Sequence, residues 1–282
     1  MSKTIITCDS TADLTPELYA KYDIKVVALS ISLGDALRRD GVDVTCGDVF
    51  AFVDETGMLP KTSAVSVGEY EDVFRPLVEE GYEVLHINLS SHLSASHQNA
   101  RLAAEEVGNV WVVDSRSLSS GTGHLVLMAR ELIEAGKTAA EAAAALEEIR
   151  EKLDVSFVLQ TLEFLHKGGR CSGVAAFGAN LMKLRPEIEV VDGKMQVGRK
   201  YRGNMEKSIL DYVRGQLEGR DDIDLHRIFI THSLVPQEIV EKVKALVKEL
   251  QPFEEVIETT AGCTISSHCG PNCLGILFFK KA

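Results

Sequence analysis

Hydrophobic and polar positions follow two alternating patterns in the first half of the chain. Short apolar runs, rich in valine and isoleucine, have the length and composition of strands buried on both faces. These runs cover residues 4–8, 25–31, 82–89 and 110–113. Amphipathic stretches, such as residues 68–80 and 95–107, lie between some of them. Because strands that alternate with helices form parallel βαβ units, we predict an α/β fold whose N-terminal sheet is largely parallel, with helices on both faces.

A long helical pattern follows, from about residue 121 to residue 153. Its alanine-rich part, residues 138–146, has high helix propensity. We expect one long helix here, acting as a hinge or spacer between two domains that comprise residues 1–155 and 156–282.

The second half of the chain differs, because helices separate only some of its strand-like runs. Predicted strands cover residues 156–160, 188–191, 195–200, 227–231, 255–260 and 274–279. Predicted helices cover residues 174–183, 204–217 and 236–250. Asp192-Gly193 between two strand-like runs is typical of a tight hairpin, so at least one strand pair is antiparallel. We therefore predict a mixed, partly antiparallel α/β domain at the C-terminus.

Composition and net charge limit the kinds of molecule that we expect the protein to bind. The 282 residues are 45% hydrophobic and 26% charged, as in an ordinary globular protein. The net charge of −12 argues against nucleic acid or an anionic membrane as the general partner. No apolar stretch approaches the roughly 20 residues that span a bilayer, so we expect no stable membrane insertion. The first residues lead directly into a strand pattern without signal-peptide features, which favours a cytoplasmic location.

Three polar stretches stand where an apolar run ends, at residues 61–66, 90–96 and 268–271. Serine and threonine often only cap helices, and a lone histidine is often structural. However, Thr62, Ser94 and His268 together offer hydroxyls and an imidazole near helix starts at the edge of a parallel sheet. Such groups suit a carboxylate, a phosphate or another small anion. We predict an anion-binding pocket, with His268 in a loop.

Residues 162–173 form a glycine-rich segment that contains Lys167 and Arg170. It fits neither the Walker pattern nor the dinucleotide fingerprint, so it gives little support for a bound nucleotide. We interpret it as a tight strand-to-helix turn, or as an exposed basic contact for a partner.

Two other site chemistries stay open on the sequence. A serine hydrolase or acyltransferase could use Ser94 or Ser120 with His268 as the base, although no G-x-S-x-G elbow is present. A thiol or metal site could use Cys263, Cys269 and Cys273, but their spacing lacks a C-x₂-C knuckle. We expect no metal and no cofactor.

Several motifs in order along the whole chain resemble the DegV family, the bacterial fatty-acid-binding proteins that serve as FakB subunits of fatty acid kinase. The motifs are residues 9–14, Lys61-Thr62-Ser63, residues 90–96, Asp114-Ser115, residues 165–170, Arg202 and His268-x-Gly270-Pro271.

The resemblance implies a two-domain α/β fold that binds one long-chain fatty acid, of C16–C18 length, in an apolar tunnel. It implies that Thr62, Ser94 and His268 hold the carboxylate, with Arg202 in the same polar network. It also implies that the chain presents the carboxylate to a separate ATP-dependent kinase subunit and has no catalysis of its own. We predict that a cationic patch docks this kinase, and its members are Lys167, Arg170, Arg199 and Lys200.

The chain departs from the family pattern at three places. Ala64-Val65 stands where the family usually has Gln-Pro, and Ala95-Ser96-His97 where Gly-Thr-Tyr is common. Asn272-Cys273 replaces smaller residues. These changes leave the expected carboxylate ligands in place and bear on acyl-chain length, unsaturation and choice of partner.

Overall fold

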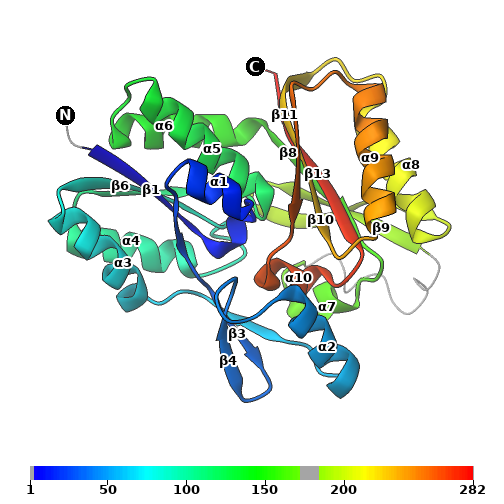
Figure 1. Ribbon diagram of the computed structural model, residues 1–282, viewed down its shortest axis with the longest axis horizontal. Coiled ribbons are helices and arrows are strands. Elements are labelled where there is room, and N and C mark those ends of the chain that lie inside the picture. The colour runs from blue at the N-terminus through cyan, green and yellow to red at the C-terminus, as the bar shows by residue number, and fades with distance from the viewer. Residues whose placement is uncertain (1–2, 172–183, 282) are drawn as a thin grey trace.

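The computed structural model describes residues 3–171 and 184–281, and their strands form three sheets (Figure 1). The first sheet is parallel throughout, with strand order β2-β1-β6-β7. Its strands are β1 (Lys3–Asp9), β2 (Lys25–Val27), β6 (Tyr82–Asn88) and β7 (Val110–Asp114). The predicted parallel N-terminal sheet is therefore confirmed.

Helices cover both faces of this parallel sheet. They are α1 (Pro16–Lys21), α3 (Val67–Glu79), α4 (Ser96–Val107), α5 (Ser120–Glu134) and α6 (Ala139–Ile149). Along β6, Val84 packs with Phe74 of α3, whereas Leu85 lies in a second core cluster with Leu125 of α5. Successive side chains of a strand point to opposite faces, so a run of consecutive apolar residues is needed where both faces are buried.

The helical block expected over residues 121–153 is two helices rather than one. α5 ends at Glu134, and Gly136 follows with a φ of 91°, a conformation that favours glycine. α6 then begins after Thr138, whose side chain forms a capping box with Glu141. The 3₁₀ turn Arg150–Lys152 leads into the next strand. α5 is buried along most of its first half, so it is a core element and not a spacer.

The second sheet is mixed and has the order β10-β9-β8-β13-β11-β12, in which only β11 and β12 are parallel neighbours. Its strands are β8 (Leu153–Val158), β9 (Leu184–Val191), β10 (Lys194–Arg202), β11 (Ile223–Ser233), β12 (Glu255–Thr260) and β13 (Cys273–Lys280). The predicted hairpin at Asp192-Gly193 joins β9 to β10. This confirms the predicted mixed α/β architecture of the second half.

The mixed sheet packs on both of its faces. α8 (Met205–Leu217) and α9 (Gln237–Leu250) cover one face through a core that includes Tyr212, Val240 and Ile276. α5 packs against the other face, where the His124 ring lies edge-on to Phe229 and Nε2 contacts the Leu277 carbonyl oxygen at 3.0 Å. Since α5 also covers the parallel sheet, it is shared between the two sheets.

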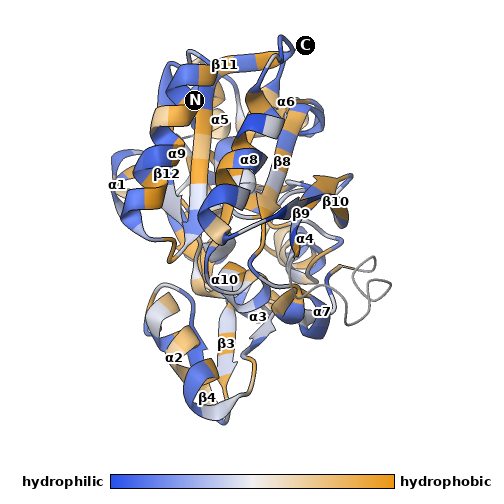
Figure 2. Ribbon diagram, turned by 90° about the vertical axis from the view of Figure 1, so that its right-hand side faces the viewer, coloured by the Kyte–Doolittle hydropathy of each residue, from blue (hydrophilic) through white to orange (hydrophobic). Residues whose placement is uncertain are grey.

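A third, small sheet was not expected from the sequence. It consists of β3 (Ser30–Leu33), β4 (Ala36–Arg39) and β5 (Lys61–Ser63), in the antiparallel order β4-β3-β5. With α2 (Cys46–Thr56) it forms a lobe that lies at one end of the molecule, away from α6 and α9 (Figures 1 and 2). The single strand predicted at residues 25–31 is wrong, because β2 joins the parallel sheet and β3 joins this lobe.

Two short helices connect the lobe to the mixed sheet. α7 (Glu163–Gly168) occupies the segment that was interpreted as a turn, and α10 (Cys263–Cys269) places His268 in a helix rather than in a loop. Figure 1 shows both helices between β3 and the mixed sheet. The helix expected at residues 174–183 lies outside the described residues.

Among the helices of the described ranges, none is both long enough and apolar enough to cross a membrane.

Candidate functional site

An open cavity lies where the three sheets meet. Its volume is about 720 Å³, including the solvent space at its mouth. β5 contributes Thr62, Ser63 and Ala64 to its wall, and the segment after β6 contributes Leu89, Leu93, Ser94 and Ala95. α10 contributes Thr264, Ile265, His268 and Cys269, and the remaining wall comes from Leu29, Leu118, Arg170 and Met195. The cavity therefore lies at the carboxyl end of β6 in the parallel sheet, where open α/β folds bind ligands.

Thr62 and His268 are brought together in this cavity from opposite ends of the sequence. The Oγ1 atom of Thr62 lies 2.9 Å from Nε2 of His268, although the residues are 206 positions apart. Thr62 stands on β5, where it pairs with Ile31 of β3. Two of the four predicted carboxylate ligands are thus in direct contact, and Ser94 lines the same cavity.

The His268 ring is held neutral and close to the backbone of α7. Burial, assisted by the positive charge of Arg170, lowers the pKa of His268 from its ordinary 6.5 to about 4. A β-carbon on Gly168 would lie 2.4 Å from Nδ1 of this ring, so glycine is required for the close approach. Nδ1 is buried and has no hydrogen-bond partner among the described residues. The neutral ring can present one N–H donor and one acceptor nitrogen.

Two carboxylates from distant segments position α10, and through it His268. Asp40 accepts hydrogen bonds from the Cys263 N–H at 2.9 Å and the Thr264 N–H at 3.1 Å. Asp13 accepts from the Gly262 N–H at 2.9 Å. These bonds satisfy backbone donors that a helix start leaves unpaired. Asp40 follows β4 of the lobe and Asp13 follows β1, so α10 is anchored to both sheets of the N-terminal half.

Ser94 is held by a local hydroxyl pair. Its Oγ lies 2.9 Å from Oγ of Ser96 and accepts the Ser96 N–H at 3.1 Å. The segment itself is anchored by Asp9, which accepts the Leu89 N–H at 3.0 Å, and by Asp114, which accepts the Ser91 N–H at 3.1 Å. The Ser94 hydroxyl is half-buried and can donate one hydrogen bond into the cavity.

The predicted cationic residues differ in their position relative to the cavity. Arg170 lines the cavity and donates to the Gly168 carbonyl oxygen at 2.7 Å. Arg202, the fourth predicted ligand, is exposed at the end of β10 and is absent from the cavity wall. Lys167 is paired with Glu163 at 2.7 Å. Arg199 and Lys200 are exposed on β10, five or so residues beyond Met195, which corresponds to about 15 Å along a strand.

Thr264 is a cavity residue that sequence reasoning missed. Its side chain is 4% exposed, lines the cavity and has an Oγ1 atom without a hydrogen-bond partner among the described residues. It precedes His268 by four positions, which places both on one face of a helix. That spacing becomes visible only once residues 263–269 are recognised as a helix.

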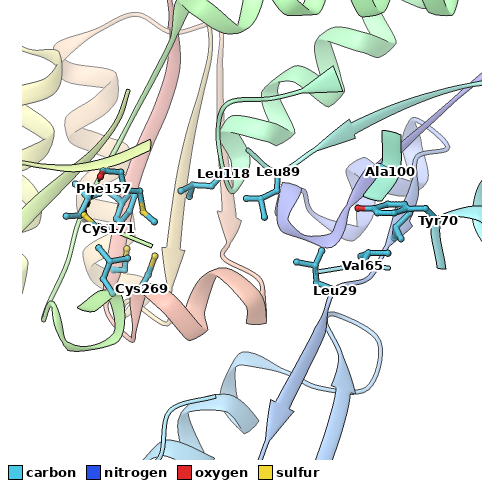
Figure 3. Close-up of a cluster of buried hydrophobic side chains, with 14 of the residues drawn as sticks. Leu29, Val65, Tyr70, Leu89, Ala100, Leu118, Phe157, Cys171 and Cys269 are labelled. Carbon is cyan, nitrogen blue, oxygen red and sulfur yellow. Dashed lines mark hydrogen bonds between the residues drawn. The ribbon is translucent and has the colours of Figure 1, made fainter. Parts of the chain in front are cut away.

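Apolar side chains form the remaining wall. Figure 3 shows Leu29, Leu89 and Leu118 between a group that contains Tyr70 and Val65 and a group that contains Phe157 and Cys269. A second, much smaller pocket shares Leu118, Ile265 and Cys269 with the first and is also lined by Gly275 and Leu277 of β13. The polar groups are thus confined to one part of a longer apolar surface.

His268 does not contact either of the serines considered as alternative nucleophiles. Ser120 is fully buried and its hydroxyl contacts that of Thr231. In the described part of the chain, His268 has no hydrogen bond to Ser94 or Ser120, since Nε2 faces Thr62. No group of three or more metal-binding side chains occurs in residues 3–171 and 184–281.

Comparison with known proteins identifies a family. The DegV family model, described as "Uncharacterised protein, DegV family", matches residues 3–281. A DegV domain-containing protein of Clostridium acetobutylicum is 30% identical over 285 residues, which cover all of both chains.

Solved structures agree with this assignment. A DegV family protein from Thermus thermophilus, described for its fatty acid binding, is 34% identical with a TM-score of 0.88, over 99% of this chain and 100% of that one. The fatty acid kinase (Fak) B3 protein of Streptococcus pneumoniae, loaded with linoleic acid, is 21% identical with a TM-score of 0.84, over 98% and 99% of the two chains. At that identity the likeness shows a shared fold.

Proposed function

The chain belongs to the DegV family, and on that basis we propose that it binds one long-chain fatty acid of C16–C18 length. The Thermus thermophilus relative is described as binding fatty acid, and it is similar over nearly the whole of this chain. The observation that carries the proposal is the contact between Thr62 and His268 in a cavity whose other walls are mainly apolar and include four leucines.

In this proposal the polar end of the cavity holds the carboxylate. Moving a carboxylate out of water costs several kcal/mol unless donors replace the lost water, so hydroxyl and imidazole donors are needed. Ser94 and Thr264 can each donate one O–H, and the Thr62–His268 pair can donate one hydrogen more, because the bond between the two residues uses the other. Arg170 adds a positive charge at the cavity wall that favours the ionised form. Arg202 would join this network only if its side chain turned inward from its exposed position.

The apolar wall supplies the affinity for the acyl chain. Each buried methylene contributes about 0.8 kcal/mol, so a tail of ~15 methylenes offers roughly 12 kcal/mol before the entropic costs of binding. The second cavity, which begins at Leu118, Ile265 and Cys269, extends the apolar path beyond the polar groups. The polar groups would therefore set the orientation of the ligand, and the apolar path would set most of its retention.

We further propose that the bound carboxylate is handed to a separate ATP-dependent kinase subunit, which forms the acyl phosphate. The family resemblance supports this step, together with the exposed position of Arg170 beside the polar end of the cavity. Lys167, Arg170, Arg199 and Lys200 remain the proposed docking residues for that partner. The chain would act as a carrier and would leave the chemistry to the kinase.

Mass spectrometry of lipid extracted from the purified, denatured protein tests the binding proposal directly. We expect about one C16–C18 fatty acid per chain. A protein that carries no lipid and takes up neither added oleate nor added palmitate would contradict it.

Replacing Thr62→Val keeps the shape of the side chain and removes its hydroxyl. We expect oleate to bind at least tenfold more weakly, because the loss of one hydrogen bond to a charged group costs about 1.5 to 3 kcal/mol. Ser94→Ala should act in the same direction, whereas Ser91→Ala, a change of an exposed serine outside the cavity wall, should leave binding unchanged. Titration with a fluorescent fatty acid measures all three variants. Unaltered affinity in both Thr62→Val and Ser94→Ala would exclude the carboxylate assignment.

A further inference from the structure

Cys46 and Cys263, which are not among the proposed carboxylate-binding residues, face each other where α2 contacts α10. The Sγ atoms of Cys46 and Cys263 lie 3.9 Å apart, although the residues are separated by 217 positions. Cys46 is the first residue of α2 and Cys263 is the first residue of α10. Two helix starts from distant parts of the sequence therefore bring their thiols together.

Each thiol also donates a hydrogen bond to the backbone segment that leads into the opposite helix. The Cys46 thiol donates to the carbonyl oxygen of Ala261, which leads into α10, at 3.0 Å. The Cys263 thiol donates to the carbonyl oxygen of Val44, which leads into α2, at 3.3 Å. Each thiol is thus fixed near the backbone of the opposite helix, which leaves the pair preorganised for a reaction between them.

Cys46 is the better nucleophile of the pair. It is half-buried, whereas Cys263 is 3% exposed. Donation from the Cys263 thiol lowers the pKa of Cys46, and the Ser266 hydroxyl, 3.4 Å away, acts in the same direction. A thiolate at Cys46 would stand at the start of a helix, where both groups could turn from their present acceptors, the Val44 and Ala261 carbonyl oxygens, to donate to it.

We propose that Cys46 and Cys263 form a reversible disulfide when the protein meets a peroxide. The Cys46 thiolate attacks one peroxide oxygen, the O–O bond breaks, and Cys46 becomes a sulfenic acid as the other oxygen leaves as water. The Cys263 sulfur then attacks the Cys46 sulfur, the S–O bond breaks, and a second water leaves. In total two thiols and one hydrogen peroxide give one disulfide and two waters. A dithiol reductant reverses the change.

Closing the bond requires little movement. A disulfide has an S–S length of about 2.05 Å, so the two sulfurs must approach by about 1.9 Å from their present 3.9 Å. The approach would require the side chains to rotate about their Cα–Cβ bonds, and it would remove the thiol contacts to Ala261 and Val44. Within residues 3–171 and 184–281, no two cysteines are joined by a disulfide.

The bond would join the lobe covalently to the helix that carries Thr264 and His268. The lobe also carries Thr62 on β5, so both partners of the Thr62–His268 contact stand on elements that the disulfide links. Formation of the disulfide does not depend on the proposed function. Its expected effect on ligand release rests on that function. We expect the oxidised protein to release a bound fatty acid at least threefold more slowly.

The test treats the intact protein with hydrogen peroxide, blocks remaining thiols, and maps peptides without reduction. We expect a Cys46–Cys263 linked peptide and a fall from six to four titratable thiols in the unfolded chain. Cys46→Ser should keep its remaining thiols under the same treatment, whereas Cys8→Ala, a change of a buried thiol elsewhere, should still form the link. Thermal melting of each variant checks that it is folded.

Three results would overturn the proposal. The first is an oxidised protein whose Cys46 and Cys263 both remain open to alkylation after unfolding. The second is a link between Cys269 and Cys273 only, and the third is oxidation of Cys46 that never leads to a bond with Cys263. Release of a fluorescent fatty acid is measured separately, so a protein that forms the link but binds no fatty acid would refute the proposed function and leave the thiol pair established.

Discussion

At the scale of single residues, His268 shows how burial sets the chemistry of the cavity. The ring is enclosed between the backbone of Gly168 and the hydroxyl of Thr62, with Arg170 nearby. Both burial and the positive charge oppose protonation, so the imidazole is neutral at pH 7. A neutral ring can share its hydrogen bonds with a hydroxyl and a carboxylate without adding a buried charge.

This depressed pKa predicts a loss of stability on acidification. In the unfolded chain His268 takes up a proton as the pH falls through 6.5, whereas in the folded chain it stays neutral until about pH 4. Between pH 6.5 and pH 4 the unfolded state therefore binds more protons than the folded state. The free energy of unfolding decreases as the pH decreases through this range. At about 1.36 kcal/mol per pH unit, His268 contributes up to ~3 kcal/mol, which is present above pH 6.5 and gone below pH 4.

Urea unfolding of the wild type and of His268→Gln between pH 4 and pH 7 measures this contribution. The difference between the two curves isolates His268, since Asp13, whose pKa is raised by burial, changes stability in the opposite direction in both proteins. We expect a flatter pH dependence in the variant. Parallel curves would show that His268 does not remain neutral in the folded protein.

At the scale of elements, α10 is the helix that unites the site. It carries Thr264 and His268, and it is anchored at its start by Asp40 and Asp13. Its own sequence gives it little helix propensity, because it is seven residues long and includes cysteine, threonine, serine and histidine. Its stability must therefore come from these tertiary contacts.

Asp40→Ala is predicted to loosen α10. The change leaves the buried N–H groups of Cys263 and Thr264 without acceptors, which costs about 2 to 3 kcal/mol. Asp35→Ala, at an exposed position on the same lobe, should change the free energy of unfolding by less than about 0.5 kcal/mol. Hydrogen exchange of the α10 amides, together with urea unfolding, measures both effects. Equal protection of α10 in the two variants would argue that Asp40 does not hold the helix.

The length and the burial of each element explain which parts of the fold the sequence could predict. The strands of the parallel and mixed sheets were identified because burial on both faces demands consecutive apolar residues, as along β6. β3, β4 and β5 were missed because they have only three or four residues each, mostly polar or half-buried. Thr62, Ser94 and His268 were recognised as polar groups beside apolar runs. Their contact distances, and the participation of Thr264, depend on α10, whose helix is specified by distant carboxylates.

At the scale of the whole molecule, the charge distribution opposes the entry of an anion. The chain has a net charge of −12, and a fatty acid carboxylate would be repelled by the average surface. Arg170 provides an exposed positive charge at the wall of the cavity. Local attraction at the mouth would therefore have to outweigh the general repulsion.

Arg170→Glu is predicted to slow association of oleate about threefold to tenfold at low salt, with a smaller effect at high salt. Lys248→Glu changes the net charge equally at an exposed position on α9, and it should have little effect. Stopped-flow fluorescence at two ionic strengths measures the rates. With a cognate kinase, Arg170→Glu should also lower acyl-phosphate formation. Equal rates for the two variants would exclude a role for Arg170 in steering or docking.

The position of β13 in the mixed sheet has a consequence for how the protein is made. β8 with its neighbours β9 and β10 forms one half of the sheet, and β11 with β12 forms the other. Among the described strands, β13 alone hydrogen-bonds to both halves, through β8 on one side and β11 on the other, and it follows them all in the sequence. During synthesis the two halves leave the ribosome with unpaired edges, since the strand that joins them is translated after both. The cavity, whose wall includes α10 just before β13, therefore cannot be completed before the C-terminal residues have been translated.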